Sequence, residues 1–138
     1  MFGISVPMIA VVIGEGGSGG ALGIGIADRV HMMEFSVYSV ISPESCASIL
    51  WSDPKRAEFA ANSLKLDPNK AKELDIIDTI IKEPVGGAHR DPNHAAEMIK
   101  ATLKEDLKAL ASLSKEELLD KRFNKFRNMG NQTINMES

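Results

Sequence analysis

Apolar runs dominate the first forty residues of the chain, and helical spacing dominates the rest. The run from Val6 to Ile13 is β-branched towards its end, and it predicts a strand that is covered on both faces. Shorter runs predict strands at Arg29 to Met33, Ser36 to Ile41 and Ile76 to Ile81. Strands of this kind, followed by helical segments, indicate an α/β fold with a helical C-terminal region.

Helix starts are marked by a capping residue followed by proline. This pair occurs at Ser42-Pro43, Asp53-Pro54, Asp67-Pro68 and Asp91-Pro92. From these starts we predict helices that end near Trp51, Leu64, Leu74 and Leu113. Ser114 and Glu117 have the spacing of a capping box for a final helix that ends near Gly130. The polar tail, residues 131–138, is expected to be disordered.

A glycine-rich stretch, Gly14 to Gly25, lies between the first two predicted strands. Glycines allow backbone N–H groups to approach a ligand oxygen, because no Cβ is in the way. A helix predicted from Gly20 to Asp28 would point its positive N-terminal end at that oxygen. We interpret the stretch as an anion or oxyanion cradle, in which Gly19 and Gly20 offer adjacent N–H groups.

Other glycine motifs compete with this interpretation. A phosphate-binding P-loop is excluded, because Gly20 and Ala21 stand where its lysine and hydroxyl residue are required. A dinucleotide fingerprint fits Gly14, Gly16 and Gly19, with Glu34 as the acidic residue, and a Rossmann-like domain therefore stays open as an alternative. The mainly helical second half of the chain argues against that fold. A membrane helix is disfavoured, because Glu15 would lie near its middle.

Composition narrows the functional classes. The 138 residues carry 16 basic and 19 acidic side chains and a net charge of −3, so no broad basic face indicates nucleic acid. The single Cys46 excludes an intrachain disulfide, and the three histidines do not have metal-ligand spacing. We expect no metal on this chain, no membrane association and a reducing, cytoplasmic location.

Four stretches of the chain, taken together, closely resemble the carboxyltransferase α-subunit family of bacterial-type acetyl-CoA carboxylase. They are Gly14 to Leu22, Tyr38 to Glu44, Cys46 to Trp51 and Glu83 to Arg90. The resemblance extends from about Val6 to Arg127 and covers the C-terminal part of that subunit. The chain has Ser45 where the family usually has glycine, a change we expect to be tolerated.

The resemblance implies a partial crotonase-like fold, a β-β-α spiral, for residues 1–130. It also implies transfer of carboxylate from carboxybiotin, on the biotin carboxyl carrier protein, to acetyl-CoA. This reaction gives malonyl-CoA and begins fatty acid biosynthesis. The implied partners are a zinc-bearing β subunit, in an α2β2 heterotetramer, and biotin carboxylase. The alternative of another class is a truncated, inactive assembly module.

The resemblance also assigns site residues. Gly19 and Gly20 match the glycine pair that holds the biotin ureido oxygen, and Gly16, Gly17 and Ser18 are expected to contact substrate beside them.

His89 and Arg90 are expected to bind a CoA phosphate or to close a subunit contact. We interpret Cys46 as a small buried residue and His31 as a strand residue. The basic run Lys121, Arg122, Lys125 and Arg127 is expected to form one solvated helix face.

Overall fold

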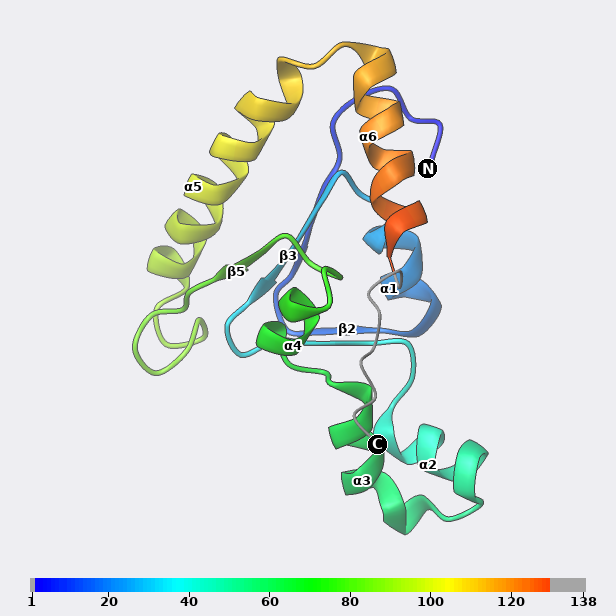
Figure 1. Ribbon diagram of the computed structural model, residues 1–138. Helices are drawn as coiled ribbons and strands as arrows, with labels where there is room; N and C mark the ends of the chain where they lie inside the picture. Colours follow the sequence, from blue (N-terminus) through cyan, green and yellow to red (C-terminus); the bar gives the residue numbers. More distant parts are fainter. Residues whose placement is uncertain (1, 130–138) are drawn as a thin grey trace.

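Two small parallel sheets and six α-helices make up residues 2–129, the part of the chain that the computed structural model describes (Figure 1). The first sheet has the order β1-β3-β5 and the second pairs β2 with β4. Their bounds are Ile9–Val12 (β1), Glu15–Gly17 (β2), Arg29–Met33 (β3), Val37–Ser39 (β4) and Thr79–Ile81 (β5). All pairings are parallel.

The chain winds as a spiral that adds one strand to each sheet per turn. In the first turn β1 is followed by β2 and by helix α1 (Ser18–Gly25). In the second turn β3 is followed by β4 and by a longer helical segment, after which β5 returns to the first sheet. Parallel strands require such crossover connections. The described residues therefore contain two turns of a β-β-α spiral, with a core of Ala10, Ala27, Val30, Met32, Ala71 and Ile77 between sheet and helices.

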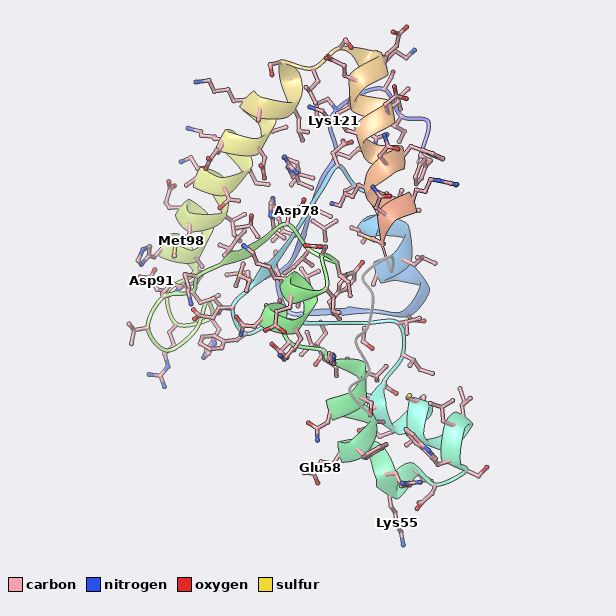
Figure 2. All side chains as sticks on the ribbon, in the orientation of Figure 1. Lys55, Glu58, Asp78, Asp91, Met98 and Lys121 are labelled. Carbon is pink, nitrogen blue, oxygen red and sulfur yellow. The ribbon has the colours of Figure 1, made fainter. Side chains whose placement is uncertain are left out.

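Helix α2 (Pro43–Trp51) and helix α3 (Ala57–Leu64) form a hairpin with its own small core of Cys46, Ala47 and Ala60. A 3₁₀ turn, η1 (Pro54–Arg56), interrupts the single helix predicted there, because the Asp53 carboxylate accepts the Lys55 N–H and tightens the first turn. The hairpin projects from the rest of the molecule in Figure 1. Lys55 and Glu58 lie at its far end in Figure 2. Helix α4 (Pro68–Glu73) leads back to β5.

The last two helices, α5 (Pro92–Ala111) and α6 (Lys115–Asn128), form a second hairpin, and α6 lies beside the N-terminal segment (Figure 1). The Asp91 carboxylate accepts the His94 N–H at the start of α5, and Ser114 and Glu117 form the predicted capping box at the start of α6. The predicted helix starts are confirmed at all of these caps, and the helix ends agree within two residues.

Several predicted elements have different bounds. The strands predicted at Ser36 to Ile41 and Ile76 to Ile81 are shorter, at Val37–Ser39 and Thr79–Ile81. The first strand begins at Ile9 rather than Val6, because side chains take the backbone groups that a neighbouring strand would need: Asp28 accepts the Met8 N–H and Arg122 donates to the Val6 carbonyl. The first helix spans Ser18–Gly25 rather than Gly20 to Asp28, because the Asp28 N–H donates to the Met8 carbonyl at 2.9 Å. The predicted disordered tail lies outside the described residues.

Candidate active site

The glycine stretch contains a short strand that the sequence analysis did not predict, because Glu15–Gly17 pair with Val37–Ser39 as β2 and β4. Gly16 lies opposite Tyr38 in this pairing. A Cβ on Gly16 would lie 3.1 Å from Tyr38 Cδ2, and a Cβ on Gly25 would collide with the Tyr38 hydroxyl. Two of the glycines are therefore required by the packing of one tyrosine, whose hydroxyl donates to the Ala21 carbonyl at 3.4 Å.

Gly19 and Gly20 are not required by packing. A Cβ on either residue would meet no atom within 4 Å among the described residues. Both residues are exposed and lie in the first turn of α1, after Ser18. They are among the first four residues of the helix, whose N–H groups have no acceptor within an α-helix, and no side chain caps this helix start. Two adjacent donors therefore lie at an exposed, uncapped helix start.

The start of α1 also differs from most other helix starts in its capping. Side chains of Ser42, Asp67, Asp91 and Ser114 cap α2, α4, α5 and α6, whereas Gly17 at the start of α1 offers no side chain. The first turn of α1 contains no acidic residue. The positive end of its helix dipole is therefore uncompensated and can attract a negative oxygen.

Ser18 has left-handed backbone geometry, with φ of 56°. This region is unfavourable for a residue with a Cβ, and such strain is concentrated at functional sites. Here it turns the chain sharply from β2 into α1. The predicted substrate contact through the Ser18 side chain stays a prediction.

Grooves lie on both sides of this turn. One, of about 270 Å³, is lined by residues from Ala10 to Gly16 and by Ala21, Ile24, Gly25, Val30 and Tyr38. The other, of about 290 Å³, includes Ser18, Leu22, Val40 and Leu64. Ala21 and Tyr38 border both grooves. The walls are mainly apolar and suit an apolar ring or chain, and Ser18 and Ala21, which flank the glycine pair, border the second groove.

The loop that carries His89 and Arg90 follows β5 and is held by Glu83. Its carboxylate accepts the Phe35 N–H at 3.1 Å and the Ala88 N–H at 2.7 Å. Gly86 and Gly87 have φ of 91° and 96°, which favours glycine. The Arg90 side chain lies over Gly86 and the His89 ring over Gly87. Both side chains are exposed, and His89 borders a third groove of about 520 Å³ under α5.

The structure brings Gly16, Gly17, Ser18, Gly19 and Gly20 together but does not join His89 and Arg90 to them. No hydrogen bond or shared groove within residues 2–129 connects the two sets. Ile13 is the link between them, since it borders both the groove at β2 and the groove at His89.

Glu34 does not serve as a ribose-binding residue. Its carboxylate lies 2.6 Å from Lys82 Nζ and accepts the Glu83 N–H at 3.2 Å. The hydrogen bond from Lys82 is the main cause, and that from the Glu83 N–H the second, of a pKa of Glu34 that lies below its usual value. In a dinucleotide fold the glycine turn leads directly from strand to helix, whereas here β2 is interposed. The structure therefore argues against the Rossmann-like alternative.

The prediction of a solvated basic face on α6 is wrong for two of its four residues. Arg122 is buried against Asp28, and Lys125 lies 2.6 Å from Asp78. Lys121 and Arg127 are exposed, as predicted. Figure 2 shows Asp78 in the centre of the molecule, between α5 and α6. The sequence analysis did not predict these two ion pairs. One signal was available for the first, because Asp28 lies between two apolar runs and a carboxylate buried there needs a partner.

Two further single-residue predictions, those for Cys46 and His31, are confirmed. Cys46 is buried in the α2–α3 hairpin, and His31 is buried in β3, where its Nε2 lies 2.6 Å from Asp106.

Among the residues that the structure describes, no group of three acidic, histidine or cysteine side chains could hold a metal ion. No helix within residues 2–129 is long and apolar enough to cross a membrane.

Comparison with known proteins identifies relatives over most of the chain. The carboxyl transferase subunit alpha of acetyl-coenzyme A carboxylase from Pseudoalteromonas atlantica is 54% identical over 130 residues, which are 94% of this chain and 41% of the relative. The protein of the same name from Staphylococcus aureus strain MRSA252 is also 54% identical, with the same coverage. The chain thus spans about two fifths of the length of these relatives. That this share is their C-terminal part stays a prediction.

A solved structure shares the fold. A chain of a Pseudomonas malonate decarboxylase hetero-tetramer, crystallised in complex with coenzyme A, superposes with a TM-score of 0.65 at 16% identity. The superposition covers 88% of this chain and 48% of that one. The predicted crotonase-like fold class is confirmed. Residues 1–130 also match the family described as acetyl co-enzyme A carboxylase carboxyltransferase-like. The chain belongs to this carboxyltransferase-like family.

Proposed function

We propose that the chain supplies the biotin-side oxyanion cradle of an acetyl-CoA carboxyltransferase. The observation that carries this proposal is the pair of adjacent N–H groups of Gly19 and Gly20 at the exposed, uncapped start of α1, where a helix provides no internal acceptor. Family membership supports the reaction class. The whole enzyme would transfer carboxylate from carboxybiotin to acetyl-CoA and yield malonyl-CoA, as the first step of fatty acid biosynthesis in the cytoplasm.

The residues at this turn fit the biotin group. Gly19 and Gly20 are exposed, and a Cβ on either would meet no atom within 4 Å among the described residues, which supports the approach of a ligand oxygen. The apolar groove beside Ala21 and Tyr38 can receive a fused ring and its chain. When bound, biotin carries the transferable carboxylate and takes up negative charge on its ureido oxygen. Gly19 and Gly20 would donate their N–H groups to that oxygen, and Gly16, Gly17 and Ser18 would line its approach.

The catalytic contribution of this chain would be electrostatic. Preorganised backbone donors stabilise developing negative charge without reorganisation during the reaction, and the loss of one donor typically lowers kcat by about 10²–10³. The free helix end adds a favourable field of about 0.3–1 kcal/mol at an exposed site. The test is carboxyl transfer after replacement of Gly20 by proline, which removes one donor, with Gly20→Ala as the matched control that keeps it.

His89 and Arg90 would bind a phosphate of CoA. Both side chains are exposed, and Glu83 together with the glycine turn fixes the loop that presents them. The Arg90 guanidinium can donate two parallel hydrogen bonds to a phosphate. Replacement of Arg90 by glutamine should raise the KM for acetyl-CoA and leave kcat unchanged. An unchanged KM would favour the alternative role in a subunit contact.

The complete enzyme would need further chains. A zinc-bearing β subunit would hold the acetyl-CoA carbonyl in an α2β2 heterotetramer, the biotin carboxyl carrier protein would deliver carboxybiotin, and biotin carboxylase would recharge it. No metal is assigned to this chain.

One observation favours the second candidate, an assembly module without activity of its own. Helix α1 is apolar along its length but has no buried residue, and Leu22 and Ile24 are 69% and 63% exposed. A helix that is apolar on all sides is normally buried. Size-exclusion chromatography of the 138-residue chain tests this candidate. Self-association or capture of a β subunit supports it, whereas a stable, well-folded monomer contradicts it.

A further inference from the structure

We propose that Arg122 is a positioning residue for the cradle, because it holds both ends of the chain segment that carries Gly19 and Gly20. The inference rests on the proposed role of these glycines. Arg122 lies in α6, whereas Gly19 and Gly20 lie in the first turn of α1. No atom of Arg122 hydrogen-bonds to the glycines, so its effect on them must pass through the residues that it contacts.

Arg122 uses all of its N–H donors. Its Nε and Nη2 donate to the two oxygens of Asp28, each at 2.8 Å. Its Nη1 donates to the carbonyls of Phe2 at 3.0 Å and Ile4 at 2.6 Å, and its Nη2 also donates to the carbonyl of Val6 at 3.2 Å. The guanidinium thus joins the segment before β1 to the segment after α1. A lysine could not do so, because it lacks the planar fork of five donors.

Asp28 also connects the segment before β1 to the segment after α1, through hydrogen bonds to the backbone of Met8. Its Oδ2 accepts the Met8 N–H at 2.7 Å, and its own N–H donates to the Met8 carbonyl at 2.9 Å. The first register pair of the sheet, Ile9 with Arg29, directly follows these two residues. The bases of β1 and β3 are therefore fixed to each other and to α6.

The position of α1 depends on this junction, since its own side chains do not anchor it. No residue of α1 is buried, and one long hydrogen bond, from the Tyr38 hydroxyl to the Ala21 carbonyl at 3.4 Å, is its side-chain tether among the described residues. Its other restraints are the partly buried contacts of Ala21 and Gly25 with Tyr38 and the two covalent ends of the helix. One end is β2, paired with β4, and the other leads to Asp28 and hence to Arg122. Loosening of the Asp28 end should therefore loosen the cradle.

The test is backbone NMR relaxation of the full chain, comparing Arg122→Lys with Leu118→Ala. Leu118 is buried on the same helix but makes none of the Arg122 hydrogen bonds, so its replacement weakens α6 packing alone. Backbone order parameters are about 0.85 in rigid segments and below about 0.6 in flexible ones. We expect the order parameters of Gly19 and Gly20 to fall towards the flexible value in Arg122→Lys and to stay unchanged in Leu118→Ala.

Equal order parameters in all three proteins, or an equal fall in Leu118→Ala, would overturn the proposal. If Arg122→Lys does not fold, Asp28→Asn decides the question, because it keeps the shape and one oxygen acceptor of the aspartate. It should loosen Gly19 and Gly20 in the same way, and unchanged order parameters in that variant would likewise overturn the proposal.

A kinetic measurement in the assembled carboxyltransferase separates this proposal from the proposed function. Arg122→Lys should lower kcat and leave the KM for acetyl-CoA unchanged, since the cradle rather than the CoA contacts is affected. If the glycines are not the oxyanion cradle, Gly20→Pro will retain full transfer while the order parameters still respond to Arg122→Lys. If Arg122 is only structural, Gly20→Pro will be inactive while those order parameters do not respond.

Discussion

The guanidinium of Arg122 and the carboxylate of Asp28 form a two-pronged ion pair, although 94 residues separate them in the sequence. The exposed fractions of the two side chains are 0% and 3%. Such a pair is costly to bury, but removal of one partner is costlier still, because it leaves an unpaired charge in the interior. The pair therefore makes the fold sensitive to either residue.

Replacement of Arg122 by methionine should lower the free energy of unfolding by about 3–5 kcal/mol, because Asp28 is left charged and buried. Chemical denaturation followed by circular dichroism measures this change. Lys121, the exposed neighbour on α6, is the control, and Lys121→Met should change stability by less than about 0.5 kcal/mol. Similar losses in both variants would show that general helix packing, rather than the ion pair, is responsible.

Acid should destabilise the protein through Asp78. Burial acts to raise the pKa of Asp78, but hydrogen bonds from Lys125 and from the Val30 N–H outweigh it, so this pKa lies below the usual 3.8. A carboxyl group whose pKa is lower in the folded state stabilises the fold above its unfolded pKa and loses this contribution as the pH falls through the folded pKa. The Tm should therefore decline below about pH 4.

Asp78→Asn should weaken that decline, because the group that titrates is gone, and should already lower the Tm at pH 7. The exposed Asp120 provides the control, since Asp120→Asn removes a carboxylate that has no ion pair among the described residues. An unaltered pH profile in Asp78→Asn would contradict this assignment.

Replacement by alanine should have opposite effects on stability at two glycines of α1, Gly23 and Gly25. A Cβ on Gly23 meets open space, so Gly23→Ala should stabilise the protein by about 0.5–1 kcal/mol through reduced backbone entropy in the unfolded chain. A Cβ on Gly25 collides with the Tyr38 hydroxyl, so Gly25→Ala should cost about 1–3 kcal/mol. Thermal unfolding measures both changes.

The double variant Gly25→Ala with Tyr38→Phe identifies the cause. Removal of the hydroxyl opens the space that the new methyl group needs, so the combined loss should be smaller than the sum of the two single losses. Additive losses would show that Gly25 is required for another reason.

Local signals predicted most of the fold. The Ser-Pro and Asp-Pro starts, the capping box at Ser114 and the apolar run at β3 each act within a few residues, and the structure has an element at every one. The strand β2 could not be predicted in this way, since its glycines have low strand propensity and are ordered by pairing with β4. The distant partner and the fit of Tyr38 over Gly16 override that propensity.

The candidate site shows the same division. The free amides of Gly19 and Gly20 follow from a local pattern of strand, glycines and helix start. The Arg122–Asp28 pair does not, because the basic residues of α6 have the spacing of an ordinary solvated face. Tertiary packing alone distinguishes Arg122 and Lys125 from their exposed neighbours Lys121 and Arg127.

The most direct measurement is carboxyl transfer to acetyl-CoA by Gly20→Pro and Gly20→Ala. Each variant is assembled with the rest of an α chain and a β subunit from a relative, and assembly is verified by size-exclusion chromatography. Proline fits the first turn of a helix, where its missing N–H breaks no helical hydrogen bond. The cradle predicts that Gly20→Pro lowers kcat by about 10²–10³, whereas Gly20→Ala, which keeps the N–H, retains far more activity. Full turnover by correctly assembled Gly20→Pro would contradict the assignment.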